Sequence, residues 1–204
     1  MISHAPDGYE CPFCFLLAGG ETEIDSQSDV VLRTELATAF VASGWWANNR
    51  GHVIVIPNEH HENIYDLPAE YGHAVHDVVR EIAVAMREAY GCEGISTRQH
   101  NEPAGGQDAW HFHVHVIPRY HGDDLYGSKP LPGFATGEQR RPYADKLLAV
   151  LRDQADRRQP RADQQVAAGE QRAVADLPQR DRVAHHVDQS GETGGDQERV
   201  QPVQ

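Results

Sequence analysis

The sequence of 204 residues predicts an α+β fold, with a five-stranded antiparallel sheet, one long helix and a short C-terminal helix. Residues 110–119 alternate between histidine and apolar side chains, which is the two-residue period of a strand. Apolar residues between positions 75 and 89 instead recur at helical spacing. The composition, with 39% hydrophobic and 24% charged residues, suits one soluble domain followed by a tail.

Five short segments are expected to form the strands. The first two flank a tight turn, and Pro57 closes the third. Pro118 is expected to end the last strand, because proline has no N–H to donate to a ladder. The predicted strands are residues 29–33, 36–42, 52–56, 94–100 and 111–117.

A long helix is expected between the third and fourth strands. Pro68 suits its first turn, and Gly91 ends it. Its apolar face would consist of Val75, Val78, Val79, Ile82, Met86 and Ala89. A second, short helix is expected at residues 142–152.

The composition changes near residue 154. No aromatic residue occurs after Tyr143, and the few Val and Leu residues that follow have no period. Such a segment buries too little apolar surface to offset the entropy of ordering it. We therefore expect a folded domain at residues 1–153 and a disordered tail at residues 154–204.

The charge of the chain limits its partners. The formal net charge is −13, and through residue 151 there are 10 Lys and Arg against 21 Asp and Glu. An acidic body disfavours binding to a nucleic-acid polymer but leaves room for a small nucleotide. No apolar run approaches the length of a membrane span, no signal peptide is visible, and three cysteines make no secreted disulfide framework. A cytoplasmic protein with no membrane partner is expected.

The alternating stretch places three histidines on one face of a strand, about 6.8 Å apart. This spacing suits one imidazole attacking a phosphorus atom while its neighbours hold the oxygens. Ordinary surface residues and ligands of a single metal are the alternatives, although a His-x-His metal pair on a strand is typical of larger barrels. The three are His111, His113 and His115, and the opposite face carries Phe112, Val114 and Val116.

Four motifs in this order resemble the histidine triad (HIT) family of nucleotide hydrolases and transferases. They are the alternating stretch, the Gly-Gly-Gln loop before it, a Gly-His strand followed by His60, and an N-terminal Cys-x-x-Cys. The resemblance covers residues 9–150. The first three motifs correspond to residues 110–119, 101–107 and 51–57, and the fourth to residues 11–14.

Cys11 and Cys14 admit three interpretations: zinc ligands, a redox pair or incidental residues. No strand precedes Cys11, as it would in a thioredoxin-type pair. Bacterial members of the family combine such cysteines with two histidines, here His60 and His111. The resemblance therefore implies a structural zinc site with four protein ligands.

The resemblance also implies a catalytic set. His113 would be the nucleophile that attacks the α-phosphate of a nucleoside 5′-phosphate derivative and forms a nucleotidyl-histidine. Gln107 and His115 would donate hydrogen bonds to the phosphate, the Gly105-Gly106 backbone would approach it, and Asn101 would lie near it. A phosphoramidate, a dinucleoside polyphosphate or an adenylated compound could be the substrate. A nucleotidyltransferase or phosphorylase, and a zinc-stabilised regulatory protein with little turnover, are the alternatives.

The chain departs from the family pattern at two places. Asp108 stands where many relatives have Ser or Thr, and would repel a phosphate unless protonated or turned outward. Relatives usually have Asp or Asn near the end of the second strand to hold the ribose, whereas this chain has Ser43-Gly44 there. Trp45 and Trp46 follow, and they could stack on a base, pack a loop or form a dimer contact. Relatives form two-fold dimers, so we expect the sheet to be extended in a homodimer through residues 94–100 and the long helix.

Overall fold

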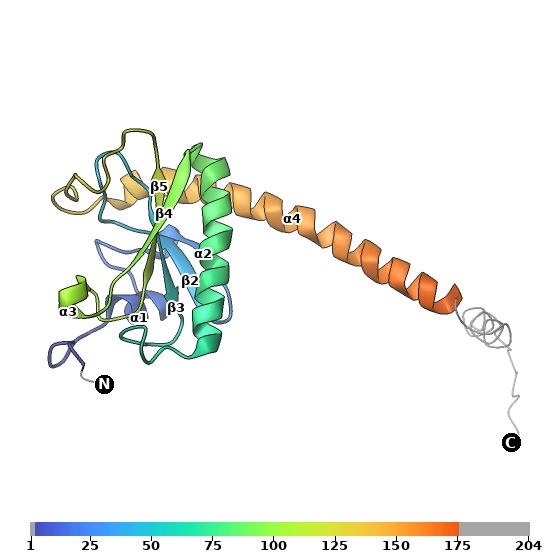
Figure 1. Ribbon diagram of the computed structural model, residues 1–204, viewed down its shortest axis with the longest axis horizontal. Helices are drawn as coiled ribbons and strands as arrows, with labels where there is room; N and C mark the ends of the chain where they lie inside the picture. Colours follow the sequence, from blue (N-terminus) through green and yellow to red (C-terminus); the bar gives the residue numbers. More distant parts are fainter. Residues whose placement is uncertain (1–2, 176–204) are drawn as a thin grey trace, which may run out of the picture. The chain divides into compact units, whose positions relative to one another are not determined.

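The computed structural model describes residues 3–175, with side chains through residue 158. The chain divides into two compact units, residues 1–154 and 155–204. The first unit holds one five-stranded sheet whose neighbouring strands are all antiparallel, in the order β1-β2-β3-β5-β4 (Figure 1). The predicted α+β fold is confirmed. The strands are β1 Val30–Arg33, β2 Ala37–Val41, β3 Val53–Pro57, β4 Gly94–Gln99 and β5 Val114–Arg119.

Strand β5 lies between β3 and β4, although it is the last strand in the sequence. His115 therefore has a registered neighbour on each side, Ile54 on β3 and Arg98 on β4. Side chains of registered neighbours lie on the same face of a sheet. Strand β4 is left at the edge of the sheet.

The start of β5 differs from the prediction. The strand begins at Val114, so His111 and His113 precede the ladder. Pro118 does not end it, because β4 pairing continues through Pro118 and Arg119. Pairing with β3 stops at Val116, so Pro118 needs no N–H for that neighbour.

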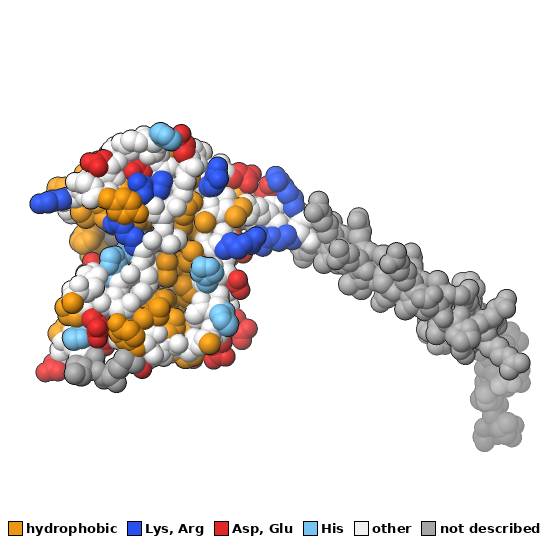
Figure 2. All heavy atoms as spheres, viewed as in Figure 1, with side chains coloured by type: hydrophobic (Ala, Val, Ile, Leu, Met, Phe, Trp, Pro, Cys, Tyr) orange, Lys and Arg blue, Asp and Glu red, His pale blue; other side chains and the backbone are white. Residues whose placement is uncertain are grey.

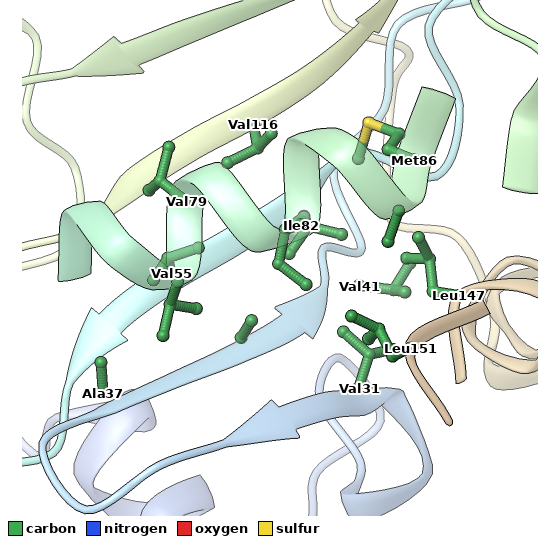
Figure 3. Packing of buried hydrophobic residues seen from close by; sticks show 14 of the residues in the cluster. Val31, Ala37, Val41, Val55, Val79, Ile82, Met86, Val116, Leu147 and Leu151 are labelled. Atoms are coloured by element: carbon green, nitrogen blue, oxygen red, sulfur yellow. The ribbon is translucent and has the colours of Figure 1, made fainter. Parts of the chain in front are cut away.

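Helix α2 (Ala69–Tyr90) lies across one face of the sheet and contacts β2, β3, β4 and β5. Pro68 is its N-cap rather than part of its first turn, and Gly91 ends it in the left-handed conformation at φ 63°. Figure 3 shows Val79, Ile82 and Met86 of α2 directed toward the strands, beside Val55 and Val116. The predicted apolar face of this helix is thus buried, apart from the half-buried Ala89.

Helix α4 (Gly137–Ala175) begins earlier and ends later than predicted. Within the first unit, Leu147 and Leu151 pack with Val31 and Val41 (Figure 3). The backbone remains helical beyond residue 152, where the apolar pattern stops, since Gln, Arg and Ala all have good helix propensity. Residues 176–204 lie outside the described residues, so the disordered tail stays a prediction.

A buried ion pair joins α4 to the segment before β1. Asp29 ends the short 3-10 helix η1 (Gln27–Asp29), and its carboxylate accepts bonds of 2.9 and 2.7 Å from the Nε and Nη2 atoms of Arg140. Both side chains are only 1% exposed. The guanidinium also donates to the Ala135 carbonyl. This pair fixes the start of α4 against the sheet.

Helix α1 (Pro12–Leu17) packs on the sheet face opposite α2. Phe13 and Leu16 form a small core there with Phe40 and Ile56. None of the described helices combines the length and apolar character needed to cross a membrane. His115 of β5 and His52, which directly precedes β3, occupy the same face as α1, so this face carries the candidate site.

Candidate functional site

His113 is held in one tautomer by the backbone. Its Nδ1 lies 2.8 Å from the carbonyl oxygen of His111, and the side chain is buried. Because a carbonyl can only accept, Nδ1 carries the proton, and Nε2 keeps a free lone pair in the neutral ring. Burial lowers the pKa of His113, although the His111 carbonyl and the Asp108 carboxylate act in the opposite direction. The arrangement presents a neutral imidazole with one nucleophilic nitrogen.

His115 lies beside His113 and pairs with a histidine that the sequence analysis did not select. The His113 and His115 rings are 4.9 Å apart, and Nδ1 of His115 is 3.3 Å from Nε2 of His52. Burial, followed by its histidine neighbours, lowers the pKa of His115 to about 2. Burial and then the charge of Arg98 lower the pKa of His52 to about 3. Both rings are therefore neutral near pH 7.

A fourth imidazole, His100, closes the group at the end of β4. Its ring centroid is 6.2 Å from that of His115, and its Nδ1 lies 2.7 Å from the Gly105 carbonyl oxygen. That carbonyl fixes the proton on Nδ1, as for His113. Sequence analysis missed His52 and His100 because both lie outside the alternating stretch. Their positions at the ends of neighbouring predicted strands were the available signal.

The Gly-Gly-Gln loop forms the short helix α3 (Glu102–Gly105). Gly106 follows it in the left-handed conformation at φ 84°, which glycine adopts without the steric cost of a side chain. A Cβ on Gly105 would meet no protein atom within 4 Å, which leaves this part of the backbone open to a ligand. Asn101 accepts from the Ile64 N–H and exchanges hydrogen bonds with Gln99, so it orders the surrounding loops.

The side chain of Gln107 is directed into the protein. Its amide nitrogen donates to the carbonyls of Glu62 and Ala109 at 2.6 and 3.0 Å, and its oxygen accepts from the Glu102 N–H at 2.8 Å. Both amide hydrogens are therefore in use, and the side chain is 5% exposed. In this conformation Gln107 holds the loop in place and has no hydrogen left to donate to a phosphate.

Cys11, Cys14, His60 and His111 come together from three separate segments. Their ligand atoms all lie within 4.8 Å of one another. Nδ1 of His111 is 3.3 Å from the sulfur of Cys11, and Nδ1 of His60 is 3.3 Å from the sulfur of Cys14. The other ring nitrogen of His111 lies 3.1 Å from the Pro57 carbonyl, which orients the ring. Two thiols and two imidazoles match the donor set of a four-coordinate structural metal site.

The two tryptophans have different surroundings. Trp45 is buried, donates its Nε1–H to the Ala42 carbonyl at 2.6 Å and packs edge-on against Tyr143. Trp46 is half-buried, and its ring is 5.8 Å from that of His52. Of the two, only Trp46 borders the histidine group.

The fold and the site together define a class. An antiparallel α+β sheet carries a cluster of imidazoles at its central strand, beside a Cys2His2 group, which is the arrangement of a histidine triad protein. Comparison with known proteins agrees, since the HIT domain model matches residues 22–122. The chain is 34% identical over 118 residues to Protein hit of Bacillus subtilis, covering 58% of this chain and 77% of that relative. The chain therefore belongs to the HIT family.

Two further comparisons bear on the site. A zinc-bound histidine triad family protein from Mycobacterium smegmatis matches with a TM-score of 0.60 and 26% identity, covering 72% of this chain and 96% of that one. The adenylylsulfatase HINT3 of Arabidopsis thaliana is 27% identical over 122 residues, which are 60% of this chain and 58% of that relative. One of these relatives is thus zinc-bound, and the other is an adenylylsulfatase.

Proposed function

We propose that this protein is a nucleotide hydrolase that attacks the α-phosphate of a nucleoside 5′-phosphate derivative. One observation carries the proposal: the His111 carbonyl fixes the proton of His113 on Nδ1, which leaves Nε2 free to attack. A buried, neutral imidazole is a competent nucleophile near pH 7. This geometry supports the catalytic roles that we propose for His113 and His115, and the nucleotide contacts that we propose for the open Gly105 backbone.

The proposed reaction has two displacements. Nε2 of His113 forms a bond to the α-phosphorus, and the bond from that phosphorus to the leaving group breaks, with its electron pair going to the leaving group. Water then attacks the same phosphorus, the P–N bond breaks, and a nucleoside monophosphate and free imidazole result. The proton that water loses goes to solvent. His115 lies where it can stabilise the phosphoryl oxygens.

A substrate panel tests the proposal. Diadenosine triphosphate, adenosine 5′-phosphosulfate and adenosine 5′-phosphoramidate should include at least one substrate, and a denaturing quench at alkaline pH, where the P–N bond survives, should trap a nucleotidyl adduct on His113. His113→Ala should abolish turnover, whereas His73→Ala, on the exposed side of α2, should not change it. Wild-type rates in His113→Ala would refute the nucleophile. Release of a nucleoside diphosphate only with added inorganic phosphate would instead identify a phosphorylase.

We also propose that Cys11, Cys14, His60 and His111 hold a zinc ion. Support comes from their convergence within 4.8 Å and from the zinc-bound relative. The ion would cross-link α1 to the segments that flank β3 and β5, and it would supply stability rather than chemistry, because four protein ligands leave no open position. All three cysteines are free thiols, which suits the cytoplasmic location that we propose.

A homodimer is the assembly that we propose. Strand β4 is at the edge of the sheet, and beside it a cavity of about 400 Å³ is lined by α2, β4 and β5, with Val75, Val79 and Val114 among its apolar residues. Figure 2 shows hydrophobic side chains in the strip between α2 and β4. A two-fold axis beside β4 would pair this strand with β4 of a second copy and would cover the hydrophobic side chains between α2 and β4. Light scattering at micromolar concentration should give twice the chain mass, and a monomer would refute the dimer.

A further inference from the structure

We propose that Arg98 forms a subsite for an anionic leaving group, phosphate or sulfate, beside the histidine group. The inference rests on the proposed hydrolase function and adds a preference to it. A nucleotide joined to a polyphosphate or a sulfate would be favoured over a nucleotide joined to an amine. The substrate class, left open by the motifs, is thereby narrowed.

The position of Arg98 places its charge next to the site. Arg98 is the registered neighbour of His115 on β4, so the two side chains leave the same face of the sheet with Cβ atoms about 5 Å apart. Its guanidinium carbon lies 5.4 Å from the centre of the Trp46 ring, and that ring borders His52. Trp46 and Arg98 thus follow His113, His115 and His52 in one series of neighbouring side chains.

Two aromatic rings hold the guanidinium. Besides Trp46, the ring of Tyr126 lies 4.8 Å from the guanidinium carbon of Arg98. Contact with aromatic faces satisfies the flat surface of a guanidinium and leaves its N–H groups, which lie in its plane, directed outward. The side chain is therefore oriented before any ligand arrives.

The N–H groups of Arg98 have no acceptor among the described residues, and no described carboxylate pairs with it. Arg119, which packs against the same Tyr126 ring, provides the contrast. Arg119 donates from Nε and Nη2 to Asp123 at 2.7 and 2.8 Å and from Nη1 to Ser96 at 2.8 Å. Arg119 is therefore neutralised, whereas Arg98 offers a free, planar donor group that matches two oxygens of a phosphate or sulfate.

The charge of Arg98 also reaches the histidines. After burial, it is the main cause that lowers the pKa of His52, and it contributes to the low pKa of His115. Neutral imidazoles are poor proton donors to a departing amine. A sulfate or pyrophosphate departs as an anion without needing a proton, and a cation near its oxygens stabilises the charge that develops.

Asp108 leads to the opposite expectation. Its exposed carboxylate raises the pKa of His113, against the effect of burial. The same negative charge would favour a neutral or cationic leaving group. The two residues therefore make competing predictions about one measurable ratio. That ratio is kcat/KM for an anionic leaving group divided by kcat/KM for an amine leaving group.

The experiment measures this ratio in the full-length protein with diadenosine triphosphate, adenosine 5′-phosphosulfate and adenosine 5′-phosphoramidate. Arg98→Met keeps the length of the side chain and removes its charge, and Arg98→Lys keeps the charge without the planar donor group. Arg80→Met, on the exposed side of α2, is the matched control. Arg98→Met should lower kcat/KM about 10- to 100-fold for the two anionic leaving groups, and less than about twofold for the phosphoramidate. Arg98→Lys should restore part of the loss.

Equal losses on all three substrates, or no loss on any, would overturn the subsite. A ratio that Asp108→Asn changes and Arg98→Met does not would overturn it as well. If the wild-type protein turns over none of the three, the proposed hydrolase function fails, and calorimetry with tripolyphosphate then decides about Arg98. Tripolyphosphate binding that Arg98→Met weakens at least tenfold would support the anion site, and equal binding by both proteins would refute it.

Discussion

Replacing Arg140 with methionine should destabilise the protein strongly. The Arg140 side chain is 1% exposed and donates two hydrogen bonds to the carboxylate of Asp29, which is equally buried, besides the one to the Ala135 carbonyl. Removing it leaves the carboxylate with the Ser26 N–H at 2.9 Å and no cation. Breaking one side of a buried ion pair costs about 3–5 kcal/mol, because an uncompensated charge remains in the interior.

The adjacent residue supplies the control. Arg141 also pairs with an aspartate, Asp145, at 3.0 Å on the same helix, but the two side chains are 58% and 59% exposed. An exposed pair of this kind contributes no more than about 0.5 kcal/mol. The two variants, Arg140→Met and Arg141→Met, therefore delete the same group from neighbouring positions and differ in burial.

Urea unfolding followed by tryptophan fluorescence measures both effects, since Trp45 packs against Tyr143 of the same helix. Arg140→Met should lower the free energy of unfolding by at least about 3 kcal/mol. The double variant Arg140→Met/Asp29→Asn should lose less stability than the sum of the two single variants, because it no longer carries an unpaired buried charge. If Arg140→Met and Arg141→Met unfold within 1 kcal/mol of each other at equal m-values, the reasoning from burial is wrong.

Three further predictions concern the site. A chelator should lower the melting temperature of the wild-type protein and leave the melting temperature of Cys14→Ser unchanged. The zinc site would be contradicted if protein purified without added metal contained no zinc and its melting temperature did not shift with chelator. Gln107→Ala should lower kcat/KM about 10²-fold by displacing the loop, and an unchanged rate in steady-state kinetics would show that other contacts hold it. The pKa of His52 is about 3 in the folded protein and 6.5 ordinarily, so below about pH 6.5 the unfolded chain takes up a proton that the folded chain does not. The free energy of unfolding should therefore fall as the pH is lowered from 6.5 toward 3. His52→Gln should reduce the slope of this fall by up to about 1.4 kcal/mol per pH unit. Urea unfolding at pH 5 and 7 measures the slope, and equal slopes for the wild-type protein and His52→Gln would refute the argument.

Period-two alternation correctly predicted which side chains of the histidine stretch share a face of the sheet, but it did not predict the residue at which the strand begins. Val114 and Val116 do face α2, and His115 faces the other side, because alternation is a property of any extended segment. The sequence could not show that pairing begins only at Val114, since the start of a ladder depends on the neighbouring strand. His52 was missed for the same reason, as its approach to His115 depends on the register between β3 and β5.

Side-chain direction in loops was the other limit. Trp45 and Trp46 are consecutive and chemically alike, yet one is core and the other borders the site. Gln107 has the residue type of a phosphate donor, but three backbone groups engage its amide. Such outcomes depend on which partners the fold brings within reach, and local sequence does not contain that information.

The late start of strand β5 has a consequence for engineering the protein. A carbonyl inside a ladder is taken up by the neighbouring strand, whereas the His111 carbonyl lies before the first paired residue and accepts from a side chain instead. Lengthening the β3–β5 ladder toward His111, a change that usually makes a sheet more robust, would compete for this oxygen. His113 could then place its proton on either ring nitrogen, and a stabilised sheet would be obtained at the expense of a defined nucleophile.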